Sequence, residues 1–301
     1  MFRPSSTHDR RTGAAAPDPA TARTHRRDPA AILSFAAIAA AGLLGVTEPA
    51  SAQADGTGPI DGPPPFLVLG AGALPEYEGA DALRAVPLIV ARARIGGAPL
   101  EITGTQARLG LVRTGNVLAG PVLGIHGARD EDVDDDRVAR LESVDASLEP
   151  GAFVAWRTPL GGLEEGTLEL GATLTGAAGG DWEGTELALG ADYSWAATPI
   201  WRLALGASVT AVDDAYADSR FGVSAEGAAA SGLAPHDPSG GAKDASVSLR
   251  SILSFSPRYG VFTRLAYTRL LDGAADGPLV DEAGSVDQAF VGAGLFVSFG
   301  R

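Results

Sequence analysis

The stretch Asp287–Phe299, close to the end of the 301-residue chain, constrains the fold more than any other. Every second residue from Ala289 to Phe299 is apolar, whereas the residues between them are glycine, glutamine, serine and two phenylalanines. Successive side chains of a β-strand leave opposite faces of the sheet, so this alternation predicts a strand with one wholly apolar face. A soluble β-sandwich would bury that face in a core. A membrane β-barrel would turn it towards lipid and leave small and polar residues for the lumen.

The same alternation recurs through most of the upstream chain. The strand predicted at Ala245–Phe255 is imperfect, because Ser251 and Ile252 fall on the faces opposite to those expected. Charged residues on the polar faces are expected to line the lumen: Glu186, Asp192, Arg202, Arg250 and Arg264. Twelve strands are predicted in all: Phe66–Ala73, Arg84–Ala93, Ala98–Ile102, Thr105–Val112, Val117–His126, Ser147–Trp156, Thr167–Thr175, Thr185–Trp195, Ile200–Val212, Ala245–Phe255, Tyr259–Leu270 and Asp287–Phe299.

The connections between these strands alternate in length. Short connections at 94–97, 113–116, 158–166, 196–199 and 256–258 contrast with long ones at 74–83, 127–146, 213–244 and 271–286. Bacterial outer-membrane barrels combine short periplasmic turns, long extracellular loops and an even number of strands. We therefore predict an all-β fold, a transmembrane antiparallel up-and-down β-barrel of about 12 strands. The first four strands are short, so ten or fourteen strands remain alternatives.

Six aromatic residues support a membrane environment. They lie beside the short turns or the C-terminus, each on the apolar face of its strand: Trp156, Trp195, Trp201, Phe255, Tyr259 and Phe299. A girdle of amphipathic rings at headgroup depth would have this distribution. The alternative is chance combined with packing in an ordinary core.

The N-terminal region has the pattern of an export signal. Six arginines precede the uncharged, alanine-rich run 30–46, and the small residues Ala50-Ser51-Ala52 follow it. This order predicts a signal peptide at 1–52, cleaved after Ala52. A retained anchor helix is the alternative. We interpret the Gly/Pro-rich segment 53–65 as a periplasmic lead-in. Residues 66–301 are predicted to form the outer-membrane barrel of a Gram-negative cell.

Composition excludes several classes of function. Cysteine is absent, which rules out disulfides, thiol nucleophiles and N-terminal lipidation on cysteine. The net charge is −14, and residues 1–52 contain six arginines and four acidic residues, so the remainder carries −16. Such acidity argues against nucleic acid as a partner. The expected surroundings are outer-membrane lipid and lipopolysaccharide.

Two stretches were considered as sites of chemistry. The run Asp130–Asp136 resembles a calcium loop in charge, but it lacks the glycine and terminal glutamate of an EF-hand. Between a calcium site and a solvated loop, a third alternative is that this run binds divalent cations loosely near lipopolysaccharide. His126, with Asp130 and Asp213-Asp214 at neighbouring strand ends, could serve an outer-membrane hydrolase. Acids and histidines are ordinary in loops, so we predict no catalytic, cofactor-binding or metal-binding residue and no enzymatic activity.

Three motifs resemble the MipA/OmpV family of outer-membrane proteins. The segment 75–81, Pro-Glu-Tyr-Glu-Gly-Ala-Asp, with Val86-Pro87, is similar to the first loop of that family. The segments 221–244 and 267–280 resemble its long loop and its penultimate segment. The chain departs from the family in ending Phe299-Gly300-Arg301 rather than on the aromatic itself, and in having His236 where an aromatic is common.

The resemblance implies an outer-membrane β-barrel without catalytic residues. One branch of the family is described as a scaffold for MltA, a murein-degrading lytic transglycosylase, together with a peptidoglycan synthase. The resemblance therefore implies a non-enzymatic structural or scaffolding role that links a murein hydrolase and a synthase. The alternatives are a narrow channel for small solutes and a surface protein in adhesion or stress responses.

The long loop also carries a structural expectation of its own. The segment Ala225–Ala230 is alanine-rich and is followed by Gly232 and Pro235, which predicts a short helix. The connection 213–244 is long, and a connection of such length is uncommon in a compact fold unless it packs against the rest of the protein or binds a partner. We expect Tyr216–Lys243 to fold over the barrel mouth or inward as a plug, with a mobile surface loop as the alternative.

Overall fold

The computed structural model describes residues 64–161, 166–178 and 183–299, so the predicted signal peptide and residues 53–63 of the lead-in lie outside it. The described chain forms one antiparallel sheet. Its strands are β1 (Phe66–Pro75), β2 (Leu83–Ile95), β3 (Ala98–Thr103), β4 (Gln106–Leu109), β5 (Val112–Thr114), β6 (Val117–His126), β7 (Ser147–Leu160), β8 (Gly166–Gly176), β9 (Thr185–Thr198), β10 (Trp201–Val212), β11 (Gly241–Ser254), β12 (Tyr259–Leu270) and β13 (Asp287–Ser298).

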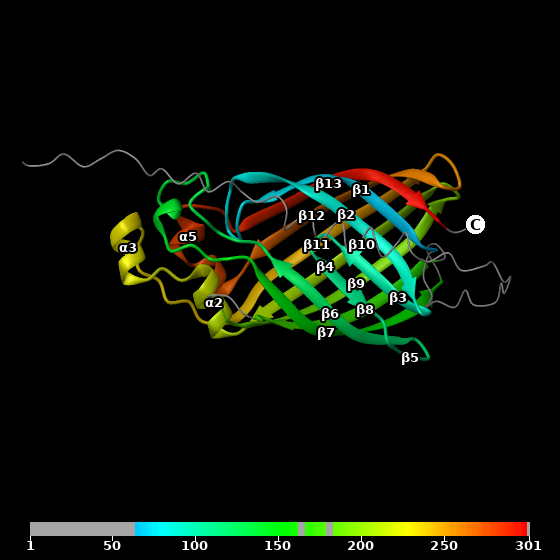
Figure 1. Cartoon of the computed structure of the whole chain (residues 1–301), viewed down its shortest axis with the longest axis horizontal. Helices are drawn as coiled ribbons and strands as arrows, with labels where there is room; N and C mark the ends of the chain where they lie inside the picture. The colour runs from blue at the N-terminus through cyan, green and yellow to red at the C-terminus, as the bar shows by residue number, and fades with distance from the viewer. Residues whose placement is uncertain (1–63, 162–165, 179–182, 300–301) are drawn as a thin grey trace, which may run out of the picture. The chain divides into compact units, whose positions relative to one another are not determined.

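The sheet closes into a barrel (Figure 1). The first strand, β1, pairs with the last, β13, from Phe66 opposite Ser298 to Ala73 opposite Val291. The strands β4 and β5 both pair with β6 and share one position in the wall, so the barrel has twelve strand positions. The predicted strand count is confirmed. The prediction of one continuous strand at Thr105–Val112 is wrong, because that strand is broken between β4 and β5.

The break lies where β6 is unable to complete its ladder. Arg108 pairs with Val122, whereas Val112 pairs with Ala119, so one extra residue is present on the β4–β5 side. Such an extra residue is a β-bulge. Pro121 lies opposite the break and has no backbone N–H to donate. The bulge therefore accommodates a proline in the wall.

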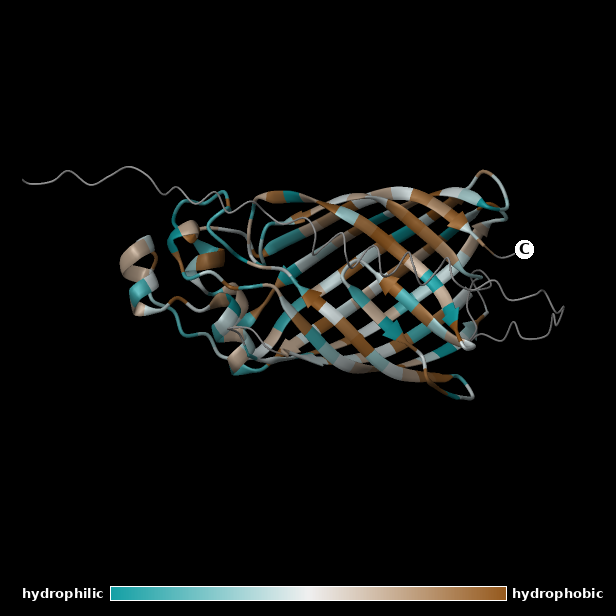
Figure 2. Ribbon diagram, in the orientation of Figure 1, coloured by the Kyte–Doolittle hydropathy of each residue, from teal (hydrophilic) through white to brown (hydrophobic). Residues whose placement is uncertain are grey.

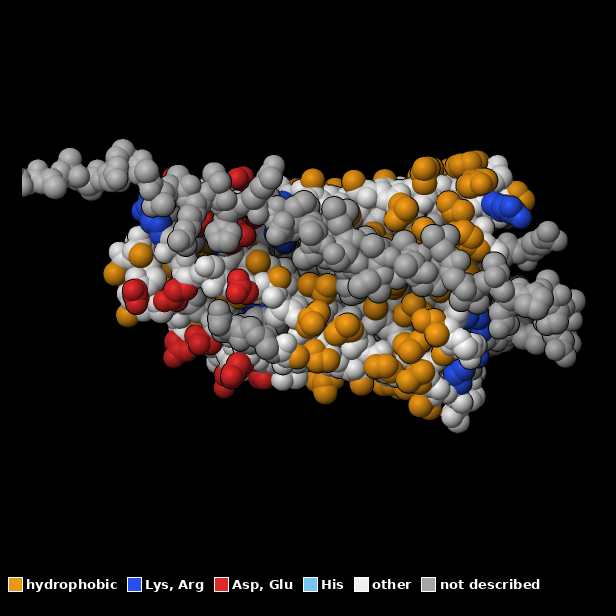
Figure 3. Space-filling model, viewed as in Figure 1, with side chains coloured by type: hydrophobic (Ala, Val, Ile, Leu, Met, Phe, Trp, Pro, Cys, Tyr) orange, Lys and Arg blue, Asp and Glu red, His pale blue; other side chains and the backbone are white. Residues whose placement is uncertain are grey.

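The apolar face of the strands lies outside the barrel, as predicted: Leu295 is 65% exposed and Leu205 is 53% exposed, although both lie within long strands. Figure 2 shows hydrophobic and hydrophilic residues alternating along the strands. Figure 3 shows hydrophobic side chains gathered on the surface over the strands. Exposure of so many large apolar residues is unfavourable in water and is expected of a surface that faces acyl chains.

Ser251 and Ile252 of β11 depart from the alternation of apolar and polar residues, and each departure has a physical reason. Ser251 faces outwards, where its Oγ accepts a hydrogen bond from Nε1 of Trp201 at 2.8 Å. An indole N–H at a membrane surface needs such a partner. Ile252 faces the lumen, where it packs against the buried side chains of Val68 and Phe262.

The predicted aromatic girdle is present at the end with the short turns. Trp156, Trp201, Phe255, Tyr259 and Phe299 are all at least 40% exposed. Trp195 is half-buried because it stacks on Tyr193, with ring centroids 5.4 Å apart. The girdle and the apolar surface together set the depth of the barrel in the bilayer.

Replacing Leu205 by arginine tests the outward orientation of this face. We expect a loss of folding free energy in phosphatidylcholine bilayers of about 2–4 kcal/mol, the cost of an arginine at the bilayer midplane. The same substitution at Ile200, in the β9–β10 turn, should cost about 0–1 kcal/mol because the residue lies near the interface. Urea titration followed by heat-modified gel mobility measures both. Equal costs at the two positions would contradict the assignment of a lipid-facing midplane.

The long connections fold into a cap at the end of the barrel opposite the C-terminus (Figure 1). We use "cap" for residues 127–146, 213–240 and 271–286. It contains the short helices η1 (Val138–Arg140), α2 (Asp214–Phe221), α3 (Ala225–Ser231), α4 (Asp272–Ala275) and α5 (Pro278–Asp281). No helix in the described part of the chain is long and apolar enough to cross a membrane.

The cap has an apolar core of its own. Tyr216 and Phe221 are completely buried, and Leu279 and Val280 are 1% exposed. The helix expected near residue 225 is α3, which ends at Gly232 with φ +81°, a conformation suited to glycine. Helix α2 precedes it in the same connection and was not predicted. The long connection 213–240 therefore folds over the barrel mouth. This confirms one of the expected alternatives for that connection.

Candidate functional site

His126, Asp130 and Asp213, the candidate residues for hydrolytic chemistry, each make contacts that support the fold. His126 Nδ1 lies 3.1 Å from Oε1 of Glu149, and its Nε2 lies 3.4 Å from Oε2 of Glu78. Asp213 is the N-cap of α2 and accepts a hydrogen bond from the backbone N–H of Tyr216 at 2.9 Å. Asp130 accepts one from the backbone N–H two residues later. These contacts orient the cap and the upper wall, and they provide no nucleophile for His126.

The acidic run in the β6–β7 connection is a set of local turns. Asp135 pairs with Arg137 at 3.0 Å, and hydrogen bonds from Arg137 lower the pKa of Asp135. The backbone N–H of Asp134 donates to Glu76. Within residues 64–161, 166–178 and 183–299, no group of three acidic or histidine side chains is arranged to hold a metal ion.

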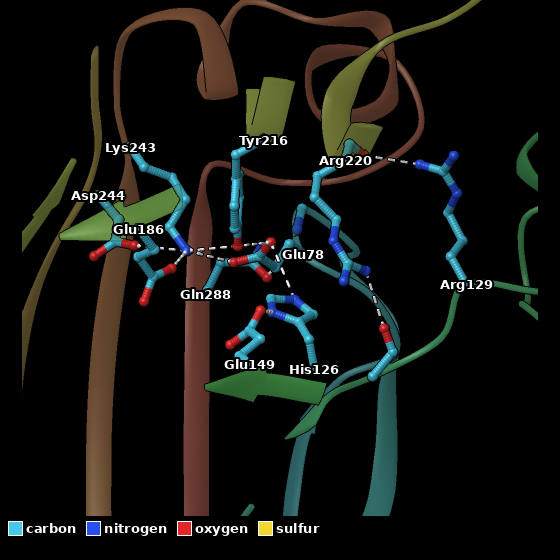
Figure 4. Close-up of polar contacts among 12 residues, drawn as sticks. Glu78, His126, Arg129, Glu149, Glu186, Tyr216, Arg220, Lys243, Asp244 and Gln288 are labelled. Carbon is cyan, nitrogen blue, oxygen red and sulfur yellow. Dashed lines mark hydrogen bonds and ion pairs between the residues drawn. The ribbon is translucent and has the colours of Figure 1, made fainter. Parts of the chain in front are cut away.

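The polar centre of the molecule is a set of side chains beneath the cap (Figure 4). We call it the mouth cluster: Glu78, His126, Glu149, Glu186, Tyr216, Lys243 and Asp244. Lys243, 5% exposed, is its cation, and its Nζ lies 2.7 Å from a carboxylate oxygen of each of Glu78 and Glu186. The same Nζ lies 3.1 Å from the hydroxyl of Tyr216. One ammonium thus joins the first outer loop, the wall and helix α2.

The cluster is electrostatically coupled. Burial alone would raise the pKa of the Glu78 carboxyl, but Lys243 and then His126 outweigh it and hold that pKa well below its ordinary value. Burial and the neighbouring Glu78 charge raise the pKa of Tyr216 well above the usual value. Tyr216 is therefore a neutral donor, and its hydroxyl donates to Oε2 of Glu78 at 2.9 Å. A charged Glu78 with a neutral tyrosine is the arrangement that ties α2 to the barrel.

The lowered pKa of Glu78 predicts a pH dependence of stability. An unfolded glutamate binds its proton near pH 4.3, whereas the folded Glu78 resists protonation to lower pH. The stabilisation is therefore present above about pH 4.3 and is lost as the pH falls through the folded pKa. We expect the free energy of unfolding to fall less steeply between about pH 5 and pH 3 in Glu78→Gln than in the wild type.

Urea unfolding at successive pH values measures this difference. Glu282→Gln is the matched control, because the Glu282 side chain is 49% exposed at the cap surface, and it should keep the wild-type slope. An unchanged slope in Glu78→Gln would show that this carboxyl does not tie the cap to the barrel.

A second polar group lies on the lumen wall in the periplasmic half. Glu101 of β3 accepts hydrogen bonds from Arg108 and Arg157, and it lies 3.0 Å from Arg92. Glu169 of β8 accepts from the same Arg108 and Arg157. Three arginines and two glutamates thus form a connected group on the wall from β2 to β8, and each ion has at least one opposite charge beside it.

The other side of the lumen is apolar. Val68, Leu88 and Phe262 are at most 3% exposed, and Phe290 and Phe296 pack around them. The guanidinium of Arg264 lies 5.4 Å from the centre of the Phe290 ring, a cation–π contact. Inward-facing side chains therefore fill this side of the barrel.

The lumen residues expected from the sequence fall into two groups. Glu186 joins the mouth cluster, Asp192 pairs with Arg250, and Arg264 packs on Phe290, so these four are in the interior. Arg202 is exposed at the periplasmic end. The Glu101 group was not predicted because Glu101 and Arg108 lie in the short strands β3 and β4, where alternation is weak. Along their strands, Arg157 and Glu169 occupy the alternating positions that also hold small or inward-facing residues. This alternation is the sequence signal that could have identified both as lumen residues.

The sequence matches the family model of the MltA-interacting protein MipA over residues 67–299, which is nearly the whole described barrel. The chain belongs to the MipA family. With its apolar outer surface and closed sheet, this MipA-family chain is an outer-membrane β-barrel. A comparison with curated protein sequences gave no significant match.

Several solved structures resemble this MipA-family barrel at low identity. The NanC porin is 8% identical with a TM-score of 0.44, over 78% of this chain and 100% of that one. OprB of Pseudomonas putida is 16% identical with a TM-score of 0.34, over 70% of this chain and 47% of that one. The CymD monoaromatic hydrocarbon channel is 11% identical with a TM-score of 0.34, over 79% and 89%. At such identities the likeness concerns the fold and not the function.

Proposed function

We propose that this protein is a non-enzymatic scaffold of the outer membrane, exported by a cleaved leader, that holds murein enzymes at its periplasmic end. The observation that carries the proposal is the packed cap. An apolar core centred on the fully buried Tyr216 and Phe221 covers the outer mouth, and Lys243 ties it to the wall. A barrel closed in this way is suited to a structural role more than to open diffusion.

The distribution of charge favours docking on the periplasmic side. Arg202 and Arg258 are exposed at the end with the short turns, whereas the exposed acidic residues of the 130–136 run lie on the cap. Figure 3 shows acidic side chains gathered at the cap end, where some basic side chains also lie, and basic side chains without acidic ones beside them at the opposite end. An anionic protein surface or murein would meet a more favourable potential at the periplasmic end.

The family name and the charge distribution together identify the partners to seek, a lytic transglycosylase and a peptidoglycan synthase. Pull-down from crosslinked envelopes should recover both with the wild type and neither with Arg202→Glu/Arg258→Glu. The matched control is Glu131→Lys/Asp136→Lys, which reverses two exposed charges on the cap and should leave recovery unchanged. Recovery of murein enzymes by the Arg202/Arg258 variant at the wild-type level would refute docking through this basic end.

A narrow channel for small solutes is the second candidate. It is favoured by the ion pairs on the lumen wall, because charged side chains are retained where water reaches them. Single-channel recording in planar bilayers separates the two functions. The scaffold predicts no conductance in the wild type, and steady conductance that is selective for small ions would favour the channel.

A further inference from the structure

A cavity of about 770 Å³ lies within the cap, between the β6–β7 and β10–β11 connections. Its charged lining residues are Arg129, Glu142, Asp218 and Asp237, and His236 also lines it. Binding sites for small molecules typically have volumes of about 300–1,000 Å³. The cavity is separate from the mouth cluster, whose seven residues do not line it.

Arg129 is a buried cation that forms no direct ion pair within the described part of the chain. The residue is 7% exposed, and its Nη1 donates to the backbone carbonyl of Arg220 at 2.9 Å. Its Nε has no hydrogen-bond partner, and no carboxylate of the described chain forms an ion pair with it. Burial lowers the pKa of Arg129; Tyr77 partly offsets this, the charge of Arg220 lowers the pKa further, and the carboxylate of Glu142 offsets only a small part.

An unpaired buried guanidinium is unfavourable, and proteins normally compensate such a charge with an anion or a hydrogen-bonded carboxylate. Guanidinium groups bind carboxylate and phosphate through two parallel hydrogen bonds. Arg129 lines a cavity large enough to admit such a group. The cavity is therefore built to receive an oxyanion beside Arg129.

The rest of the lining selects more than a simple anion. Glu142, Asp218 and Asp237 are exposed residues of the lining, and serines 143, 219 and 224 also line the cavity. The hydroxyl of Ser224 donates to Oε1 of Glu142 at 3.0 Å. Nε2 of His236 is buried in this region and has no partner in the described chain. Carboxylates would repel a bare anion but accept hydrogen bonds from hydroxyl groups, and such charge-assisted bonds are strong.

We propose that the cavity binds an acidic saccharide, with its carboxylate or phosphate against Arg129 and its hydroxyl groups against the carboxylates of the lining. The volume holds one to a few sugar rings. The saccharide comes either from a soluble pool or from the phosphorylated sugars of lipopolysaccharide in the outer leaflet. This site is independent of periplasmic docking, because it lies on the opposite end of the barrel.

The test uses the full barrel, folded in detergent, with isothermal titration calorimetry. The probes are glucose 6-phosphate, glucose and inorganic phosphate. Glucose 6-phosphate should bind at least ten times more tightly than either of the others, because only it has both a phosphate for Arg129 and hydroxyl groups for the carboxylates. Arg129→Gln should weaken its binding at least tenfold, whereas Arg140→Gln should not, since Arg140 is exposed in the same connection and does not line the cavity.

A second variant does not depend on a buried position. Asp218→Asn/Asp237→Asn changes two exposed side chains and should reduce the affinity for glucose 6-phosphate to that for phosphate. Equal binding of glucose and its phosphate, equal binding of phosphate and the sugar phosphate, or unchanged affinity in this double variant would each overturn the proposal. Competition by rough lipopolysaccharide micelles would assign the sugar to the outer leaflet, and no competition would assign it to the soluble pool.

Discussion

Replacing Lys243 by methionine is expected to lower the free energy of unfolding by about 3–5 kcal/mol and to loosen the cap. Methionine keeps most of the side-chain volume but removes the ammonium that contacts Glu78, Glu186 and Asp244, and it leaves His126 beside Glu78. Removal of one partner from a buried ion pair leaves the other charge uncompensated, which costs more than the pair contributes. Three carboxylates would then repel one another beneath the cap.

The measurement is urea unfolding in detergent, followed by the loss of heat-modified gel mobility. Glu78→Gln combined with Lys243→Met should recover part of the loss, because it removes one of the three carboxylates. Arg269→Met is the matched control: its ion pair with Asp287 is on the surface, where the side chains are at least 50% exposed, and such pairs contribute little. An equally small effect at Lys243 would show that the cap is held by its apolar core alone.

The same lysine provides a direct readout of cap opening. Lys243 is the only lysine in the chain, so acylation of its amine can be followed by mass spectrometry without interference from other side chains. The native protein should react slowly because the side chain is 5% exposed. Tyr216→Phe should raise the rate of acylation, since it removes the hydroxyl that joins α2 to the cluster.

Replacing Glu101 by glutamine is expected to have a comparable effect in the lumen, about 3–5 kcal/mol. Glu101 is the common partner of Arg92, Arg108 and Arg157, and the Arg157 side chain is only 6% exposed. Without this carboxylate, three guanidinium groups face one another, and Glu169 compensates only two of them. The barrel should unfold at a lower urea concentration with an unchanged dependence on urea.

Two further variants make the interpretation specific. Arg92→Gln combined with Glu101→Gln should restore part of the stability, because it removes one of the three cations. Asp287→Asn removes a carboxylate that is 50% exposed in a strand of the same barrel, and it should change the urea midpoint little. No recovery in the Arg92/Glu101 double variant would mean that shape, and not charge, makes Glu101 necessary.

The orientation of the strands could be predicted because it depends on local sequence. A period of two places Leu205 and Leu295 on the outside whatever their neighbours are, and the short turns confine Trp201 and Phe255 to one interface. The start of β9 and the end of β10 followed from the same pattern, whereas β9 continues three residues beyond the predicted Trp195. The break between β4 and β5 did not, because it depends on Pro121 in the adjacent strand.

The polar interactions required the three-dimensional structure. Arg157 and Glu101 are 56 positions apart, and they meet only because register and closure bring β3, β4, β7 and β8 to one side of the lumen. Glu78 and Lys243 are 165 positions apart, and their contact needs both a complete barrel and a folded cap.

The sequence by itself determined which side chains face lipid, because alternation along a strand is a property of the backbone alone. Only the tertiary structure decided which charges form ion pairs and which, like Arg129, form none within the described part of the chain. Electrostatic energy depends on distance and burial, and neither is defined until the barrel has closed and the cap has packed.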